Sequence, residues 1–200
     1  MNVYVESNFV LELTLLQASH ASCEAILQLA EEGAARLVIP AFSLIEPYET
    51  LRSHQLRRKT MKNGLDEEFR QLARTASYSS RLAEFANLTS LLIDGADEDD
   101  RRLEVVRTRL LAIAEIVSID ASILLAADQH RTIHDLKPHD AVVYSSVLAH
   151  LDRSDKSPSC FLNEDARDFD DPDLVEELAR RNCDLILTFD AGHQFLLDHR

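Results

Sequence analysis

The chain opens with Met1-Asn-Val-Tyr-Val-Glu-Ser-Asn-Phe-Val-Leu-Glu-Leu13, and this stretch indicates the fold. Residues 3–5 favour a β-strand, Ser7 and Asn8 are typical helix caps, and apolar residues at helical spacing follow. In an open parallel α/β sheet, ligands bind outside the carboxyl ends of strands, where Glu6 is expected. A helix N-terminus also stabilises an acid, so Glu6 alone does not decide between a structural and a functional role.

The composition describes an ordinary globular protein of 200 residues with 46% hydrophobic residues. Its three cysteines are odd in number and far apart, and no Cys-x-x-Cys pair occurs, which favours reduced thiols over a structural zinc site. No apolar run approaches the length of a membrane span. We therefore expect a cytoplasmic protein with no membrane partner.

The net charge of −14 repels nucleic acid at long range. One stretch is nevertheless basic, and it supplies candidate substrate contacts at Arg52, Arg57, Arg58 and Lys59. A solvated helical face is the commoner explanation of such a cluster, so the sequence leaves both interpretations open.

Short apolar runs alternate with helical patterns along most of the chain. Strands are expected at residues 3–5, 36–39, 115–119, 159–162 and 183–188. Asp120 is expected to cap the helix that follows the third strand, and Asp171 the helix that precedes the fifth. This alternation predicts a three-layer α/β/α fold around a central, mainly parallel sheet of four to five strands.

One segment has no strand candidate. Residues from about 51 to 114 are helical throughout, and Asn63-Gly64 and Asp94-Gly95 are expected to divide them into three helices. We interpret residues 1–200 as one domain and this segment as a helical insertion in it.

Four acids occupy related positions in the predicted fold. Glu6 and Asp165 follow short strands, Glu46 comes shortly after another, and Asp140 lies where a helix begins at the same edge of the sheet. Each has a structural alternative: Ser43 and Glu46 have the spacing of a capping box, and Asp140 suits a helix N-terminus. Together, however, the four carboxylates are expected to face one point.

Four carboxylates at one dry site cannot all remain ionised without cations. Carboxylate and water oxygens are the ligands that Mg²⁺ and Mn²⁺ prefer. Such a site lowers the pKa of a bound water and positions a phosphodiester for attack. No Gly-x-Ser-x-Gly motif and no glycine-rich nucleotide-binding loop occurs. The sequence therefore contains no signature of a nucleophilic serine or of a nucleotide-phosphate site.

Several segments resemble PIN-domain nucleases in the order in which that family has them. Residues 3–10, Val-Tyr-Val-Glu-Ser-Asn-Phe-Val, resemble the family's first strand and first acid. Residues 38–40 with Glu46 resemble the second strand and second acid. Residues 137–143 resemble the segment of the third acid, and residues 161–169 resemble the turn of the fourth. The resemblance does not extend to the helical segment from about 51 to 114.

This resemblance implies a metal-dependent endoribonuclease with Mg²⁺ or Mn²⁺ as cofactor and RNA as substrate, single-stranded DNA being less expected. The residues that would hold the metal are Glu6, Glu46, Asp140 and Asp165. The supporting residues would be Ser7, Asn8 and Asn163, with Asp168 as a further candidate. Many relatives are bacterial VapC-type toxins of toxin–antitoxin pairs and dimerise, which implies an antitoxin partner and a homodimer.

Two positions depart from the family pattern, because Glu6 stands where aspartate is usual and Asn163 where a hydroxyl residue is usual. These departures and the insertion leave a second function open, that of a catalytically weak PIN-like module that binds RNA or a protein partner. A third is a metal-dependent phosphatase for small phosphoesters, although the paired Asp-x-Asp that often follows the first strand of such enzymes does not occur.

Overall fold

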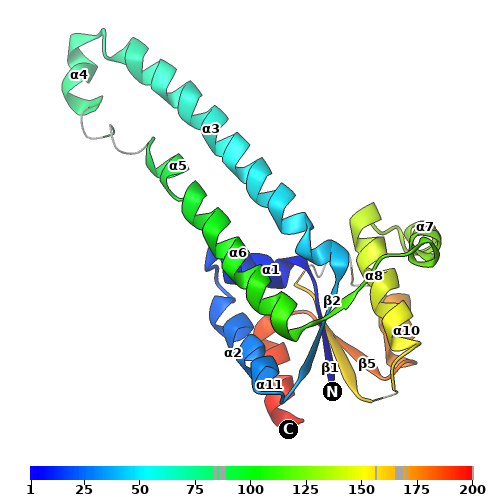
Figure 1. Ribbon diagram of the computed structural model, residues 1–200. Coiled ribbons are helices and arrows are strands. Elements are labelled where there is room, and N and C mark those ends of the chain that lie inside the picture. Colours follow the sequence, from blue (N-terminus) through cyan, green and yellow to red (C-terminus); the bar gives the residue numbers. More distant parts are fainter. Residues whose placement is uncertain (83–84, 86–88, 156, 165–168, 170, 200) are drawn as a thin grey trace. The chain divides into compact units, whose positions relative to one another are not determined.

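Figure 1 shows the computed structural model of the chain, which describes residues 1–82, 85, 89–155, 157–164, 169 and 171–199. The chain forms two compact units. The first combines residues 1–47 with 105–200, and the second consists of residues 48–104. The insertion expected at about 51–114 therefore corresponds in large part to the second unit, whereas its last ten residues belong to the first.

A five-stranded parallel sheet forms the centre of the first unit. Its strands are β1 (Asn2–Val5), β2 (Arg36–Pro40), β3 (Glu115–Val117), β4 (Ser159–Leu162) and β5 (Cys183–Ile186). Their order in the sheet is β3-β2-β1-β4-β5, so β1 is the central strand. This arrangement confirms the predicted α/β fold with a central parallel sheet.

Helices cover both faces of the sheet (Figure 1). The described helices that lie wholly in this unit are α1 (Ser7–Leu15), α2 (His20–Glu31), α7 (Ala121–His134), α8 (Pro138–Leu151), α10 (Pro172–Ala179) and α11 (Phe189–Asp198), with a short 3₁₀ helix η1 (Ala41–Leu44). The expected caps are confirmed, because Asp120 accepts a hydrogen bond from Ile123 N and Asp171 accepts one from Asp173 N. None of the described helices combines the length and the apolar character that crossing a membrane would need.

The sheet separates two layers of core side chains. Tyr4 pairs in register with Val38 and Phe161, and these three buried side chains belong to the core that includes α7, α8 and α10. Because side chains alternate along a strand, the next residue, Val5, faces the other layer, that of α1, α2 and α11. Burying one such side chain fully contributes about 1.5–3 kcal/mol, so both layers hold the central strand in place.

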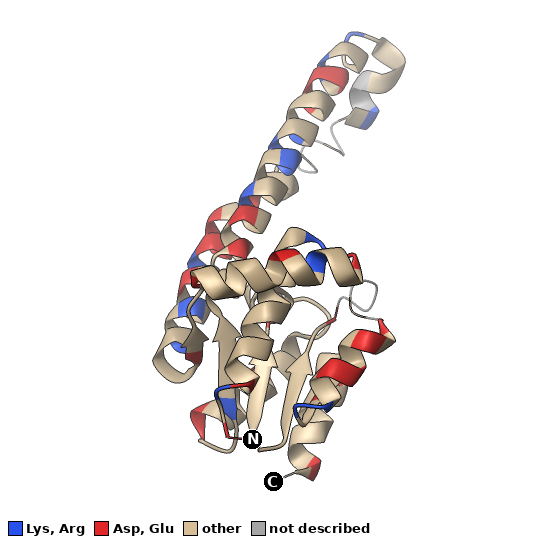
Figure 2. Cartoon of the chain, turned by 90° about the vertical axis from the view of Figure 1, so that its right-hand side faces the viewer, with Lys and Arg blue, Asp and Glu red and all other residues tan. Residues whose placement is uncertain are grey.

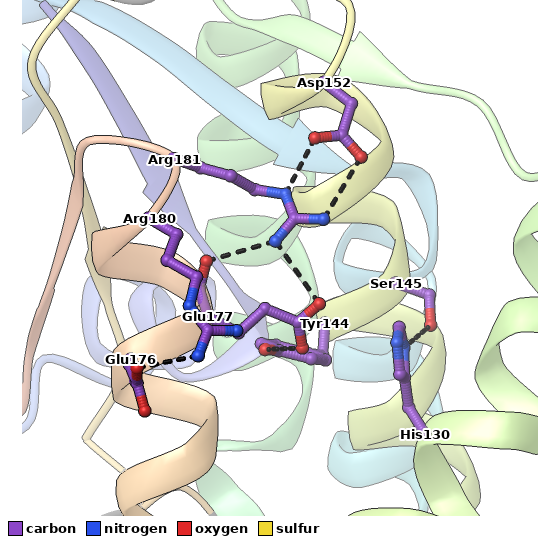
Figure 3. Close-up of polar contacts among 8 residues, drawn as sticks. All are labelled: His130, Tyr144, Ser145, Asp152, Glu176, Glu177, Arg180 and Arg181. Carbon is purple, nitrogen blue, oxygen red and sulfur yellow. Dashed lines mark hydrogen bonds and ion pairs between the residues drawn. The ribbon is translucent and has the colours of Figure 1, made fainter.

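Polar contacts connect α8 to α10 (Figure 3). The Tyr144 hydroxyl donates a hydrogen bond to Glu177 Oε2 at 2.9 Å. Arg181 follows α10, and its guanidinium donates to both oxygens of Asp152, at 2.7 and 3.4 Å, and to Glu177 Oε1 at 3.3 Å. Two-point contact with a carboxylate fixes the guanidinium plane. We name this set the α8–α10 clamp.

The second unit is helical. It contains most of α3 (Glu46–Leu72), then α4 (Ala76–Leu82), α5 (Leu91–Asp94) and the beginning of α6 (Ala96–Ile113). Within the unit α3 and α6 run side by side, since Gln55 Nε2 donates to Asp100 Oδ1 at 2.9 Å and Arg58 pairs with Asp99 at 3.6 Å.

Helix α3 differs from the sequence prediction because it continues through Asn63-Gly64. A single glycine in a helix costs about 0.5–1 kcal/mol relative to alanine, which is too little to end a helix of 27 residues. An ion pair between Lys62 and Asp66, one helical turn apart, spans the position. The Asp94-Gly95 break is confirmed, since α5 ends at Asp94 and Gly95 is its C-cap.

Candidate functional site

Glu6 directly follows the central strand and is the N-cap of α1. Its Oε2 accepts a hydrogen bond from the Asn8 backbone N–H at 2.9 Å. The residue is 7% exposed, and in the described part of the chain its Oε1 is buried without a hydrogen-bond partner. Helix capping therefore accounts for one carboxylate oxygen and leaves the other unexplained.

Burial raises the pKa of Glu6 to about 8, from its ordinary value of 4.5. Hydrogen bonds from Asn8 act in the opposite direction, and the negative charges of Glu46 and Asp140 raise the pKa further. The three carboxyl groups are therefore close enough to interact through their charges. A cation among them would offset both the burial and the repulsion.

Glu46 is the first residue of α3 and belongs to the same unit as Glu6. Its Oε2 accepts a hydrogen bond from the Ser7 hydroxyl. The predicted capping box with Ser43 is wrong: Ser43 lies in η1, and its buried hydroxyl has no hydrogen-bond partner among the described residues. Glu46 is thus fixed by the residue that follows Glu6 rather than by its own helix start.

Asp140 lies in the first turn of α8, after Pro138 at the helix start. This position was expected, and the helix dipole stabilises an acid there. The Asp140 side chain is 16% exposed, and its Oδ2 is 3.4 Å from His139 Nε2. Sequence reasoning missed His139, and its only sequence signal is its position beside Asp140 at the start of a helix.

The segment after β4 is described in part. Asn163 is buried, and its backbone N–H donates to Ile186 O at 3.0 Å, so it is held at the end of the sheet. Glu164 was not singled out in the sequence, and its Oε1 accepts a hydrogen bond from the Ser19 hydroxyl at 2.7 Å. The candidate acids Asp165 and Asp168 lie outside the described residues.

The donor chemistry of Glu6, Glu46 and Asp140 fits a hard divalent cation, because all three supply carboxylate oxygens. The unpartnered Oε1 of Glu6 is an oxygen that such a cation would satisfy. Within the described ranges, no group of three His, Cys, Asp or Glu side chains is already arranged around a metal position.

The basic candidates are all on α3 in the unit of residues 48–104. Arg52, Arg57 and Lys59 are exposed, whereas Arg58 is half-buried and pairs with Asp99. Figure 2 shows Lys and Arg as well as Asp and Glu along the long helices of this unit. The four side chains therefore do not form one uniform cationic surface.

A separate pocket of about 220 Å³ lies between α7, α8 and α10, and none of the three described candidate acids lines it. On its wall, His130 Nδ1 and the Ser145 hydroxyl are 2.9 Å apart, and Arg181 is held by Asp152 (Figure 3). The volume is below the range of about 300–1,000 Å³ usual for small-molecule sites. Its polar groups bind one another, so it is a part of the helix packing.

A family model described as a PIN domain matches residues 3–169, which is most of the chain. A comparison with curated proteins gave no match. Among solved structures, the chain is similar to the crystal structure of VapBC2 from Rickettsia felis bound to a DNA fragment from their promoter. The sequence identity is 12% and the TM-score 0.47, and the likeness covers 93% of this chain and 98% of that chain.

Proposed function

The chain belongs to the PIN-domain family of nucleases, and on that premise we propose that it is an endoribonuclease that uses Mg²⁺ or Mn²⁺ to hydrolyse RNA phosphodiester bonds. When bound, the metal would supply an activated water and charge stabilisation for the phosphodiester. Glu6, Glu46 and Asp140 would hold it, together with Asp165.

The surrounding residues have positioning roles in this proposal. The Ser7 hydroxyl holds one oxygen of Glu46, and the Asn8 N–H holds one oxygen of Glu6. These contacts restrict the rotation of each carboxylate and leave its second oxygen available to a cation. Hydrogen bonds of this kind orient metal ligands and raise metal affinity.

The observation that carries the proposal is the unpartnered oxygen of Glu6. Burying a carboxylate without compensation is unfavourable, and Glu6 is buried at the end of the central strand, where the charges of two further acids also act on it. A structural role explains only Oε2. Coordination of a cation by Oε1 would explain the burial, and Glu46 and Asp140, whose charges act on Glu6, are the further ligands that we propose.

The direct test is cleavage of labelled single-stranded and hairpin RNAs by the purified full chain with Mn²⁺ or Mg²⁺. We expect metal-dependent cleavage that chelation stops and that Asp140→Asn abolishes. Asp128→Asn is the matched control, because Asp128 is an exposed acid on α7 that is not among the candidate ligands and that faces Arg131 at 4.0 Å. Intact RNA at high Mn²⁺ would rule out the enzyme, and turnover of small phosphoesters without RNA cleavage would indicate a phosphatase.

The alternative is a PIN-like module that binds RNA or a protein and cleaves weakly or not at all. It is motivated by Glu6, which is one methylene longer than the aspartate usual in the family. It predicts no metal binding, together with partner binding that Asp140→Asn leaves unchanged. An antitoxin partner and a homodimer remain proposals; a small reading frame beside the gene tests the first, and the mass of the purified chain by light scattering tests the second.

A further inference from the structure

An apolar strip lies on the exposed side of α3, in the unit of residues 48–104. Its members line one shallow hollow, and we name them the α3 stripe: Ser53, Leu56, Arg57, Thr60 and Met61. Leu56 is 66% exposed and Met61 54% exposed. Because residues three and four positions apart share a helix face, these side chains form one continuous surface.

Cations border this strip. Arg57 is part of it, and Arg52 and Lys59 are exposed on the same helix within one turn of Leu56. In the described part of the chain, none of these three has a hydrogen bond or ion pair through its side chain. Arg58, by contrast, points to α6 and pairs with Asp99. The ion pair of Arg58 thus neutralises one cation toward α6, whereas the described residues pair with none of the three cations at the α3 stripe.

We propose that the α3 stripe binds an acidic amphipathic helix of a partner protein. Apolar residues of that helix would pack on Leu56 and Met61, in the space that the small side chains of Ser53 and Thr60 leave. Its carboxylates would pair with the cations at the border, an arrangement that selects the partner by charge. The proposal concerns this unit alone, and it holds whether or not the first unit cleaves RNA.

The composition of the surface favours a protein helix over nucleic acid. Proteins bind single-stranded nucleic acid through aromatic side chains that stack with the bases. Residues 51–68 contain no Phe, Tyr or Trp. Contact with a phosphate backbone would also leave Leu56 and Met61 without an apolar counterpart. A symmetric dimer through the same surface would place Arg57 and its neighbours opposite identical cations, which is unfavourable.

The test measures binding of the full chain to a fluorescent synthetic helix with leucines on one face and glutamates at its borders. A second peptide, with lysines in place of the glutamates, and a labelled single-stranded RNA are the comparison probes. The informative variants are Leu56→Ser and Arg57→Glu. Their matched controls are Leu91→Ser and Arg101→Glu, since Leu91 and Arg101 are exposed in the same unit but outside the stripe.

We expect the acidic peptide to bind wild type and both controls equally, and to bind Leu56→Ser and Arg57→Glu about tenfold more weakly. The lysine peptide should bind wild type about tenfold more weakly than the acidic one. Circular dichroism of each variant should match wild type, because the changed side chains are exposed. Absence of acidic-peptide binding, or equal binding by all variants, would overturn the proposal. So would RNA binding lost in the same two variants, or a dimer that Leu56→Ser dissociates.

Discussion

Ser7 donates a hydrogen bond through its hydroxyl to Glu46 Oε2, across 39 positions of sequence. Ser7 is the residue after Glu6, so the end of the central strand and the start of α3 are connected at one point. This contact aligns two acids that come from different elements. It also replaces the local capping contact that the sequence around Glu46 suggested.

Removal of that hydroxyl tests whether it positions a metal ligand. In Ser7→Ala, Glu46 loses its donor and its carboxylate gains freedom, so Mn²⁺ affinity should fall about tenfold. Ser22→Ala is the matched control, because the Ser22 hydroxyl also donates to an acid, Asp190, in an exposed contact. Calorimetric titration with Mn²⁺ measures both variants, and equal affinities in the two would contradict the role of Ser7.

Glu6→Gln should stabilise the metal-free protein at neutral pH. The pKa of Glu6 is about 8 in the folded state, above its ordinary value of 4.5, so the folded chain favours the protonated form. Stability from this group is fully present below about pH 4.5 and is lost as the pH rises through 8. The gain from Gln should thus be small near pH 5 and largest near pH 8.

Thermal unfolding in the presence of a chelator measures this difference in stability between Glu6→Gln and wild type. In a chain of this size, each kcal/mol corresponds to a change in Tm of about 2–4 °C. Saturating Mn²⁺ should reverse the order, because the metal stabilises only a chain that binds it. If wild type were more stable than Glu6→Gln at pH 8 without metal, the charge of Glu6 would have to be compensated by another group.

The α8–α10 clamp predicts different effects for two adjacent arginines (Figure 3). Arg181→Ala removes the contacts to Asp152 and Glu177 and should cost about 1–2 kcal/mol. Arg180→Ala removes an exposed pair with Glu176 and should cost less than about 0.5 kcal/mol. Urea unfolding measures both, and amide exchange in α10 should increase only in the first. Equal costs would mean that the clamp does not connect the helices energetically.

Two glycines predict changes of opposite sign. A Cβ at Gly192 would lie 2.7 Å from the Leu162 side chain, which is fully buried before Asn163, so Gly192→Ala should destabilise the chain by about 1–3 kcal/mol. Space is open around Gly64 in α3, so Gly64→Ala should stabilise by about 0.5–1 kcal/mol. Chemical unfolding measures both changes. A stabilising Gly192→Ala would show that α11 moves freely against β4.

Local chemistry made much of the fold predictable from sequence. The buried strands are short apolar runs, and the helices after them start at residues such as Asp120, whose side chain binds a nearby backbone N–H. Both signals depend on neighbours in the chain. The position of Glu6 at the end of a strand follows from the same pattern, whereas the central place of that strand in the sheet does not.

Contacts between distant residues were not predictable in this way. Ser43 and Glu46 have the spacing of a capping box, but the tertiary contact with Ser7 replaces it. The charge coupling of Glu6 to Asp140 depends on how α8 packs on the sheet. Likewise, the sequence identified the basic cluster of α3 but gave no sign that Arg58 pairs with Asp99 of α6.

The central claim is that the acids around Glu6 hold a divalent cation, and calorimetric titration of the metal-free full chain with Mn²⁺ tests it most directly. We predict saturable binding by wild type and by Asp128→Asn, and about a tenfold or greater loss of affinity in Glu6→Gln and in Asp140→Asn. Binding heats indistinguishable from buffer in wild type, or equal affinities in all four proteins, would contradict it.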